Sequence, residues 1–286
     1  MNNPTKTPTL LLFIATIMIL LFFAGCQDQH CGDLTMEEIT ITDNIQGVII
    51  EGPWHVTISQ DSLDNSAFLE YSLRNQKYVT TQLLPNGYLH IKLSASWKSS
   101  RYNCNYRATI KAMNLEKIEG SGAATIITSG HFANLNHITL SGASAINGLS
   151  CKGTSARIVL SGASALKSFI FEGSDINAEF SGASSATFDN VNLNYCEVEC
   201  TGASKFKSSG YATKTSFKGS GASDFQTLNL ESENLDIDLS GASEAVVRVN
   251  NTIKGRLSGA SVLKYKKGAN VSEVHLSGES RLIPID

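Results

Sequence analysis

A short block of small residues recurs from residue 121 to residue 280 of the chain at a nearly constant interval. The block has the form [Ser/Thr]-Gly-Ala-[Ser/Ala], and its last copy has Glu279 in place of Ala. The blocks begin at Ser121, Ser141, Ser161, Ser181, Thr201, Ser220, Ser240, Ser258 and Ser277, with spacings of 20, 20, 20, 20, 19, 20, 18 and 19 residues. A repeat period of this size is typical of a solenoid, in which each repeat stacks on its neighbours.

The residues on both sides of the block alternate between apolar and polar side chains. Before the block, for example, Ile237 and Leu239 flank Asp238. After the block, the position five residues from its first Ser or Thr is again apolar, as in Ile146 and Leu166. Such alternation is typical of strands with one buried face, which excludes a helical repeat. The consensus of leucine-rich repeats is also missing. We therefore predict an all-β fold, a parallel β-helix (β-solenoid) with coils of about 20 residues.

The small residues suit tight corners between strands. Glycine can adopt the positive φ of a sharp corner, and we expect the alanine to lie inside the bend. We expect the serine hydroxyls to form a structural ladder of hydrogen bonds along the rod; the alternative is a surface that orders ice or binds glycans. No His or Asp recurs in register to activate these serines as nucleophiles. The predicted ladder residues are Ser141, Gly142, Ser161, Gly162, Ser181, Gly182, Thr201, Gly202, Ser220, Gly221, Ser240, Gly241, Ser258 and Gly259.

Residues 45–113 are less regular but rich in β patterns. Residues 47–58 resemble a degenerate copy of strand, corner and strand, with Glu51-Gly52-Pro53 at the corner. Further strands are predicted at 88–93 and 106–112. We expect this segment to form the first coils and to cap the open end of the rod. The predicted organisation is a signal peptide (1–25), a polar tether (26–44), N-terminal coils and cap (45–113) and regular repeats (114–286).

The amino terminus carries an apolar run from Leu10 to Ala24, broken only by Thr16. This run is too short to span a bilayer comfortably and is typical of a secretory signal. It ends in Phe23-Ala24-Gly25-Cys26, which resembles the lipobox of bacterial lipoproteins. We therefore predict lipidation of Cys26 and anchoring in the cell envelope, at the outer membrane. Whether the rod faces the periplasm or the exterior stays open.

An odd number of cysteines remains once Cys26 is set aside, so not all of them can pair within the chain. Cys196 and Cys200 lie in one predicted strand, about 13 Å apart at 3.3 Å per residue, too far for a disulfide. We expect both to behave as small buried apolar residues rather than as metal ligands. The pairing of the other cysteines, Cys31, Cys104 and Cys151, stays open.

Acidic residues lie at outward positions of the strand before the corner. They are Glu179, Glu197, Glu199, Asp236 and Asp238. Neighbouring coils place such side chains about 5 Å apart, close enough for a cation site or for an acid/base pair of a polysaccharide lyase or hydrolase. The alternative, which we favour, is a solvated face with ion pairs between coils to Lys218, Lys254 and Arg256. We predict no catalytic residue, no metal and no cofactor.

Composition restricts the partners. With 23 Lys and Arg against 26 Asp and Glu, the chain lacks the basic excess that nucleic-acid binding needs. Of its 23 glycines and 35 serines, 9 and 16 fall inside the corner blocks, so this bias belongs to a folded rod and not to a linker. A glycan or an envelope protein is the expected ligand. The sequence leaves the oligomeric state open.

Residues 45–285 resemble the bacterial GIN or DUF2807 family, described as auto-transporter adhesin heads. The resemblance is carried by the segments 56–60 (VTISQ) and 107–111 (RATIK), the Ser-Gly-Ala-Ser corners and residues 262–265 (VLKY). It implies a right-handed β-helix in the cell envelope, but no established activity. We expect a lipid-anchored adhesin or binding scaffold without catalytic activity. The alternatives are a polysaccharide-acting enzyme and a structural envelope spacer.

Overall fold

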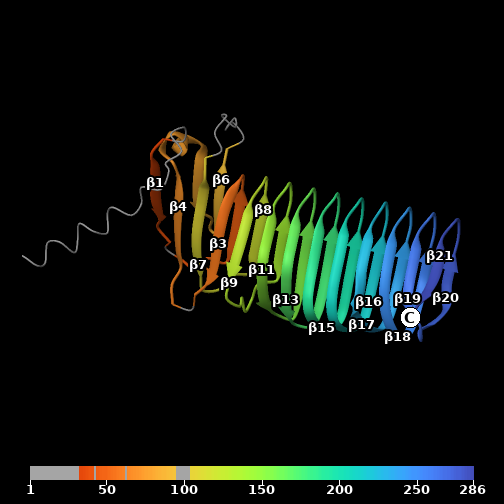
Figure 1. Ribbon diagram of the computed structural model, residues 1–286. Helices are drawn as coiled ribbons and strands as arrows, with labels where there is room; N and C mark the ends of the chain where they lie inside the picture. Colours follow the sequence, from red (N-terminus) through yellow and green to blue (C-terminus); the bar gives the residue numbers. More distant parts are fainter. Residues whose placement is uncertain (1–31, 42, 62, 95–103) are drawn as a thin grey trace, which may run out of the picture.

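The computed structural model describes residues 32–41, 43–61, 63–94 and 104–286, and the predicted signal peptide, Cys26 and Cys31 lie outside these residues. The described residues contain 21 strands joined by hydrogen bonds into one continuous sheet that winds around a single core. Figure 1 shows the coils stacked side by side along one axis. The predicted all-β solenoid is confirmed.

The N-terminal strands form the first coils of the stack. They are β1 (Leu34–Ile39), β2 (Gly47–Glu51), β3 (Trp54–Gln60), β4 (Ser66–Ser72), β5 (Val79–Leu83), β6 (Tyr88–Leu93) and β7 (Tyr106–Ala112), with a 3-10 helix, η1 (Leu73–Tyr78). A corner at Gly52, whose φ is 113°, joins β2 to β3. The stacking departs from chain order, because β2 pairs with β6 and β8, and β3 pairs with β7 and β9.

Antiparallel strands close the N-terminal end of the stack. Strand β4 pairs with β7, β1 pairs with β4, and β5 pairs with β6. Reversing the strand direction ends the parallel ladder that would otherwise stay open. Strand β1 lies within the segment 26–44 that we expected to be a tether, so residues 34–39 belong to the folded body.

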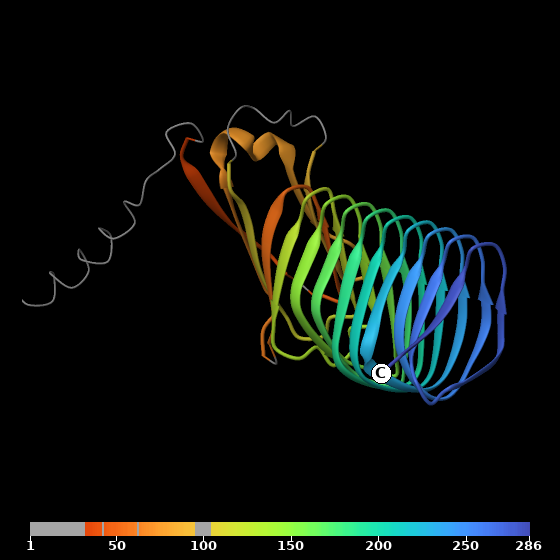
Figure 2. The same ribbon diagram turned by 45° about the vertical axis from the view of Figure 1, so that its right-hand side comes forward.

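Each regular coil contributes one strand before its corner and one after it. The remaining strands are β8 (Lys117–Ser121), β9 (Thr125–Ser129), β10 (His137–Leu140), β11 (Ala145–Lys152), β12 (Ser155–Leu160), β13 (Ala165–Glu172), β14 (Asp175–Phe180), β15 (Ser185–Cys200), β16 (Lys205–Gly219), β17 (Asp224–Leu239), β18 (Glu244–Leu257), β19 (Val262–Lys266), β20 (Asn270–Leu276) and β21 (Arg281–Ile285). Strands β15 to β18 each run through both faces of a coil in one piece, bending opposite the corner (Figure 2). The result is a flattened solenoid with two parallel strand faces.

The alternating pattern places apolar side chains in columns along the core. In the middle of the rod, the rings of Phe169, Phe188 and Phe206 pack edge to face, with successive centroids 5.0 Å apart. Phe225 continues the column, 6.4 Å from Phe206. Stacked aromatic rings bury large apolar areas, so this column is a main contributor to the stability of the central coils.

The cysteines follow the same pattern. Cys151, Cys196 and Cys200 are free thiols buried in the core, as expected for Cys196 and Cys200. Burial raises the pKa of the Cys151 and Cys196 thiols to about 12, and it raises the pKa of Cys200 as well. Cys104 is disulfide-bonded. The three buried thiols therefore stay protonated and act as apolar packing groups.

The corners stack backbone on backbone. Gly162 has a φ of 71°, and a Cβ added there would lie 2.6 Å from the carbonyl oxygen of Gly142 in the previous coil. The amide of Ala163 donates to that same oxygen at 2.7 Å. The first serine of a corner bonds to the backbone rather than to another hydroxyl, as when Ser181 Oγ donates to the Leu160 carbonyl at 3.5 Å. From Gly142 to Gly278, each corner glycine faces a backbone carbonyl oxygen of the previous coil, so only glycine fits there.

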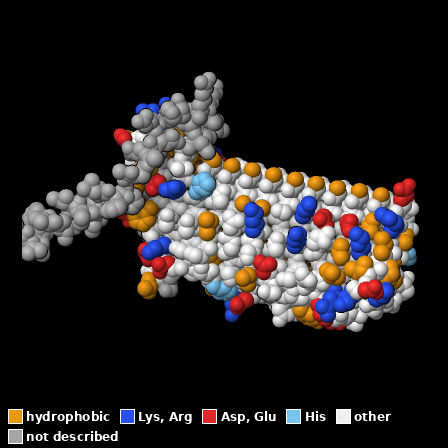
Figure 3. Space-filling view, viewed as in Figure 1, with side chains coloured by type: hydrophobic (Ala, Val, Ile, Leu, Met, Phe, Trp, Pro, Cys, Tyr) orange, Lys and Arg blue, Asp and Glu red, His pale blue; other side chains and the backbone are white. Residues whose placement is uncertain are grey.

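The alanine of the corner lies outside the bend, and our expectation that it fills the inside was wrong. The alanines of the corners are exposed, whereas the fourth residue, such as Ser184 or Ser204, is fully buried. The buried hydroxyl of Ser204 donates to the carbonyl of Thr201 at 2.8 Å, which closes the turn from inside. Figure 3 shows a row of small hydrophobic side chains along the upper edge of the solenoid, where the corners lie.

Candidate functional site: an outer face of charged side chains

The five predicted acidic residues lie on one strand face, here called the outer charged face. It comprises the outward side chains of β14 and β20 and of the second halves of β15, β16, β17 and β18. One column runs through Glu179, Glu199, Lys218, Asp238, Arg256 and His275, and a second through Glu197, Ser216, Asp236, Lys254 and Glu273. The structure therefore brings the predicted residues into two rows. Glu179 and Glu199 are direct neighbours in the first row, and Lys218 separates Glu199 from Asp238.

Most of these carboxylates form ion pairs with cations from other coils. Arg157 Nη2 lies 2.7 Å from Glu179 Oε1, and Lys218 Nζ lies 2.9 Å from Glu197 Oε1. Exposed pairs of this kind contribute only about 0–1 kcal/mol each, so their main effect is on the charge that the face presents.

The carboxylates of β17 are paired as well. Asp236 Oδ2 lies 2.8 Å from Lys214 Nζ, and its Oδ1 lies 3.4 Å from Lys254 Nζ. Asp238 Oδ2 lies 3.2 Å from Arg256 Nη2. Partial burial raises the pKa of Asp236, but hydrogen bonding and charge from the two lysines outweigh it and leave the pKa below its ordinary value. Asp236 is therefore held ionised and is unsuited to act as a general acid.

Glu199 differs from the other four acidic residues. It is exposed, its register neighbours are Glu179 and Lys218, and it makes no ion pair within the described part of the chain. Among the described residues, no group of three or more His, Cys, Asp or Glu side chains is arranged to hold a metal ion. The face therefore lacks the converging carboxylates that a cation would need.

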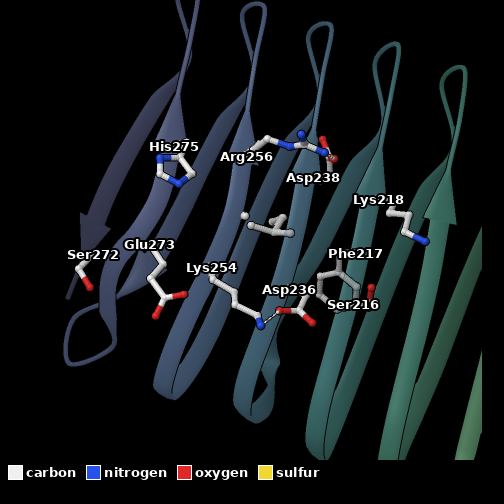
Figure 4. Close-up of a pocket in the computed structure, with 12 residues that line it drawn as sticks. Ser216, Phe217, Lys218, Asp236, Asp238, Lys254, Arg256, Ser272, Glu273 and His275 are labelled. Carbon is white, nitrogen blue, oxygen red and sulfur yellow. Dashed lines mark hydrogen bonds and ion pairs between the residues drawn. The ribbon is translucent and has the colours of Figure 1, made fainter.

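A hollow of about 540 Å³ lies at the C-terminal end of this face. Charged side chains of β17, β18 and β20 surround it, and Phe217 and Ile237 line it from the core side (Figure 4). Figure 4 shows Lys254 reaching across to Asp236 along the rim, with Glu273 and His275 on the next strand. The hollow thus combines an apolar floor with a rim of both charges.

Gly255 explains why the face is open here. It occupies an inward position that holds Val198, Phe217 and Ile237 in the preceding coils, so one apolar side chain is missing. Its φ is 138°, and an added Cβ would lie 1.8 Å from the Ile237 carbonyl oxygen. Backbone contact with the previous coil replaces side-chain packing at this point.

Sequence reasoning identified Asp236 and Asp238 but did not identify Glu273 and His275 as members of the same hollow. Two signals were present in the sequence. The coil that begins at Ser240 has 18 residues instead of 20, and Gly255 interrupts an apolar column. Both point to a local change in the shape of the face.

The comparisons place the chain in a family. The profile of a family described as "Putative auto-transporter adhesin, head GIN domain" matches residues 44–269. The chain belongs to this GIN head-domain family. No curated protein matches it. Membership indicates a protein of the cell envelope or cell surface. Within the described residues, no helix has the length and apolar character needed to cross a membrane.

Solved structures share the fold at low sequence identity. A crystal structure titled as a putative adhesin from Parabacteroides distasonis has a TM-score of 0.63 and 13% identity, covering 89% of this chain and 98% of that one. One titled as a putative lipid binding protein from the same organism has a TM-score of 0.60 and 14% identity, with the same coverage. A putative adhesin from Parabacteroides merdae has a TM-score of 0.54 and 13% identity, covering 89% and 97%. At these identities, the similarity extends to the fold alone.

Proposed function

We propose that this GIN-family chain is a lipid-anchored binding scaffold of the cell envelope, of the adhesin type, and that it has no catalytic activity. The observation that carries the proposal is the pairing on the outer charged face. Four of its five predicted carboxylates are held by Lys or Arg from other coils, so they are not arranged as a free acid and base. A rigid rod with charges of both signs is suited to recognition.

The ligand expected from this proposal is a glycan or an envelope protein. A polysaccharide-acting enzyme would need two carboxylates in different protonation states on either side of a bond. Glu199 has no ion pair in the described structure, but its register neighbours are another carboxylate and a lysine. Family membership supports adhesion. A purely structural spacer would bind neither a glycan nor an envelope protein.

Adhesion is tested with cells that carry the full-length protein on their envelope. Cells that lack the gene, and cells with a variant reversing two rim charges, Lys254→Glu and Arg256→Glu, serve as comparisons. We expect retention of wild-type cells on a glycan-coated or envelope-coated surface and loss of retention without the gene. The charge-reversal variant shows whether the outer charged face takes part in the contact. Equal retention of all three strains would contradict adhesion and leave the spacer.

Anchoring is tested separately through Cys26. Several acyl chains provide stable membrane attachment, at about 0.8 kcal/mol per buried CH₂ group. Cys26→Ser should move the protein from the membrane fraction to the soluble fraction and abolish acyl labelling, while the nearby control His30→Gln should change neither. Continued acyl labelling of the Cys26→Ser chain would refute the anchor. Protease treatment of intact cells then decides between the periplasmic and exterior orientations.

A further inference from the structure

A second hollow lies at the bend of the central coils, on the strand face that follows the corner. It encloses about 600 Å³ and is lined by residues of β15, β16 and β17. We call it the bend hollow. Its volume is in the range of small-molecule sites in proteins.

The bend hollow coincides with register shifts in three successive ladders, from β15 to β18. The ladder between β15 and β16 shifts between Phe188 and Val191, and that between β16 and β17 shifts between Lys207 and Ser209. The next ladder shifts after Thr227. Bulges of this kind re-aim side chains and are frequent next to binding sites. Here Leu228 and Asn229, which are consecutive in sequence, are both exposed.

The bulge is held in place by a local hydrogen bond. Asn190 has a φ of 53°, a left-handed conformation that is uncommon outside glycine. Its amide donates to Ser209 Oγ at 3.0 Å, which ties β15 to β16 at the rim of the hollow. The rim is therefore pre-shaped before any ligand arrives, which lowers the entropic cost of binding.

The charged groups of the bend hollow form no ion pairs with other described residues, in contrast to most carboxylates of the outer charged face. Lys205, Lys207, Asp189 and Asp224 line the hollow. Asp224 Oδ1 accepts a hydrogen bond from Gln226 Nε2 at 2.5 Å. Within the described part of the chain, none of the four forms an ion pair, whereas cross-coil pairs on the outer charged face lie 2.7 to 3.4 Å apart. Two positive and two negative groups balance each other around the hollow. The hollow is thus rich in charged hydrogen-bonding groups but has no net charge to attract an ion.

We propose that the bend hollow binds a neutral saccharide unit. Carboxylates accept hydrogen bonds from neighbouring hydroxyls, the lysines donate to hydroxyl oxygens, and Asn229 can do both. Leu228, 40% exposed, offers an apolar surface to the C–H face of a sugar ring. The proposal rests on the adhesin function and adds to it the ligand class and the place of contact.

The test measures binding of the detergent-extracted full-length chain to an array of oligosaccharides. The array holds neutral oligosaccharides, N-acetylated ones, and ones that carry uronic acid or sulfate. Asp189→Asn and Lys207→Gln are the test variants. Lys167→Gln is the matched control, because Lys167 is an exposed lysine on the same face that does not line the bend hollow. Circular dichroism checks that each variant remains folded.

We expect neutral oligosaccharides to bind, and each test variant to weaken that binding by about tenfold or more while Lys167→Gln leaves it unchanged. Preference for sulfated or uronic-acid glycans would overturn the neutral ligand class. Binding of neutral glycans that all three variants retain would overturn the site but leave the adhesin proposal intact. Absence of any glycan binding by protein that still supports cell adhesion would overturn the saccharide and point to an envelope protein as the adhesion partner.

Discussion

Substituting one corner glycine tests why the repeat tolerates no larger residue there. In Gly202→Ala, the new Cβ would lie 2.6 Å from the Gly182 carbonyl oxygen, with φ at 72°. The left-handed conformation costs about 1–2 kcal/mol. Forcing the two coils apart adds a packing penalty of about 1–3 kcal/mol. The expected loss of stability is therefore about 2–5 kcal/mol.

Two other glycines separate the contributions. Gly148 has a φ of 74°, but its added Cβ would find its nearest atom at 3.9 Å, so Gly148→Ala should cost only the conformational strain, about 1–2 kcal/mol. Gly153 has no left-handed φ and a nearest atom at 3.7 Å, so Gly153→Ala should change stability by no more than about 1 kcal/mol.

Urea unfolding followed by circular dichroism measures the three effects as shifts of the midpoint at constant m-value. The expected order of destabilisation is Gly202→Ala, then Gly148→Ala, then Gly153→Ala. Equal losses for Gly202→Ala and Gly148→Ala would refute the argument that close backbone contact between coils selects glycine at the corner.

Three further outcomes follow from individual side chains. Ser208 is buried, and its Oγ has no hydrogen-bond partner among the described residues. Ser208→Ala should therefore raise the free energy of unfolding by about 1 kcal/mol, seen as a higher urea midpoint, and a lower midpoint would contradict this. Cys151, Cys196 and Cys200 should resist alkylation in the native protein and react in urea, while Cys104 should appear in a disulfide in a non-reduced peptide map. The hydrogen bond from Lys92, with a further contribution from His90, lowers the pKa of Glu51 below its ordinary value of 4.5. The stability that Glu51 contributes is thus present above pH 4.5 and is lost as the pH falls through the lower folded-state pKa. Glu51→Gln should therefore make the free energy of unfolding fall less steeply with decreasing pH in this acid range. An unchanged pH dependence would contradict this.

The regular coils were predictable because the same corner residues and the same alternation of apolar and polar positions recur in each coil. The corner glycine and the alternating apolar positions such as Ile158 and Leu160 determine where the chain turns and which face is buried. The order of the first coils was not predictable. The strands 47–51 and 88–93 have similar apolar patterns, and which of them lies against 117–121 depends on contacts between distant segments.

The sites were predictable in part. The alternating pattern placed Asp236 and Asp238 on one outward face and indicated ion pairs with Lys218, Lys254 and Arg256, which the structure contains. The further pairs from Arg157 and Lys214 depend on side-chain length and register. The bend hollow was not predicted from the sequence. A coil of 19 residues shows that one residue is missing, but not at which point along the strands the register shifts to accommodate it. The outward alanine of the corner was missed because residue size alone does not distinguish the inside of a turn from the outside.

Whether the solenoid only binds a glycan or also cleaves it is tested most directly by following reducing ends over time. The full-length protein is incubated with the oligosaccharides that it binds, beside the Glu199→Gln variant. A binding scaffold predicts no release of reducing ends above buffer for either protein. Steady release by the wild-type chain that Glu199→Gln abolishes would contradict the scaffold and establish an enzyme.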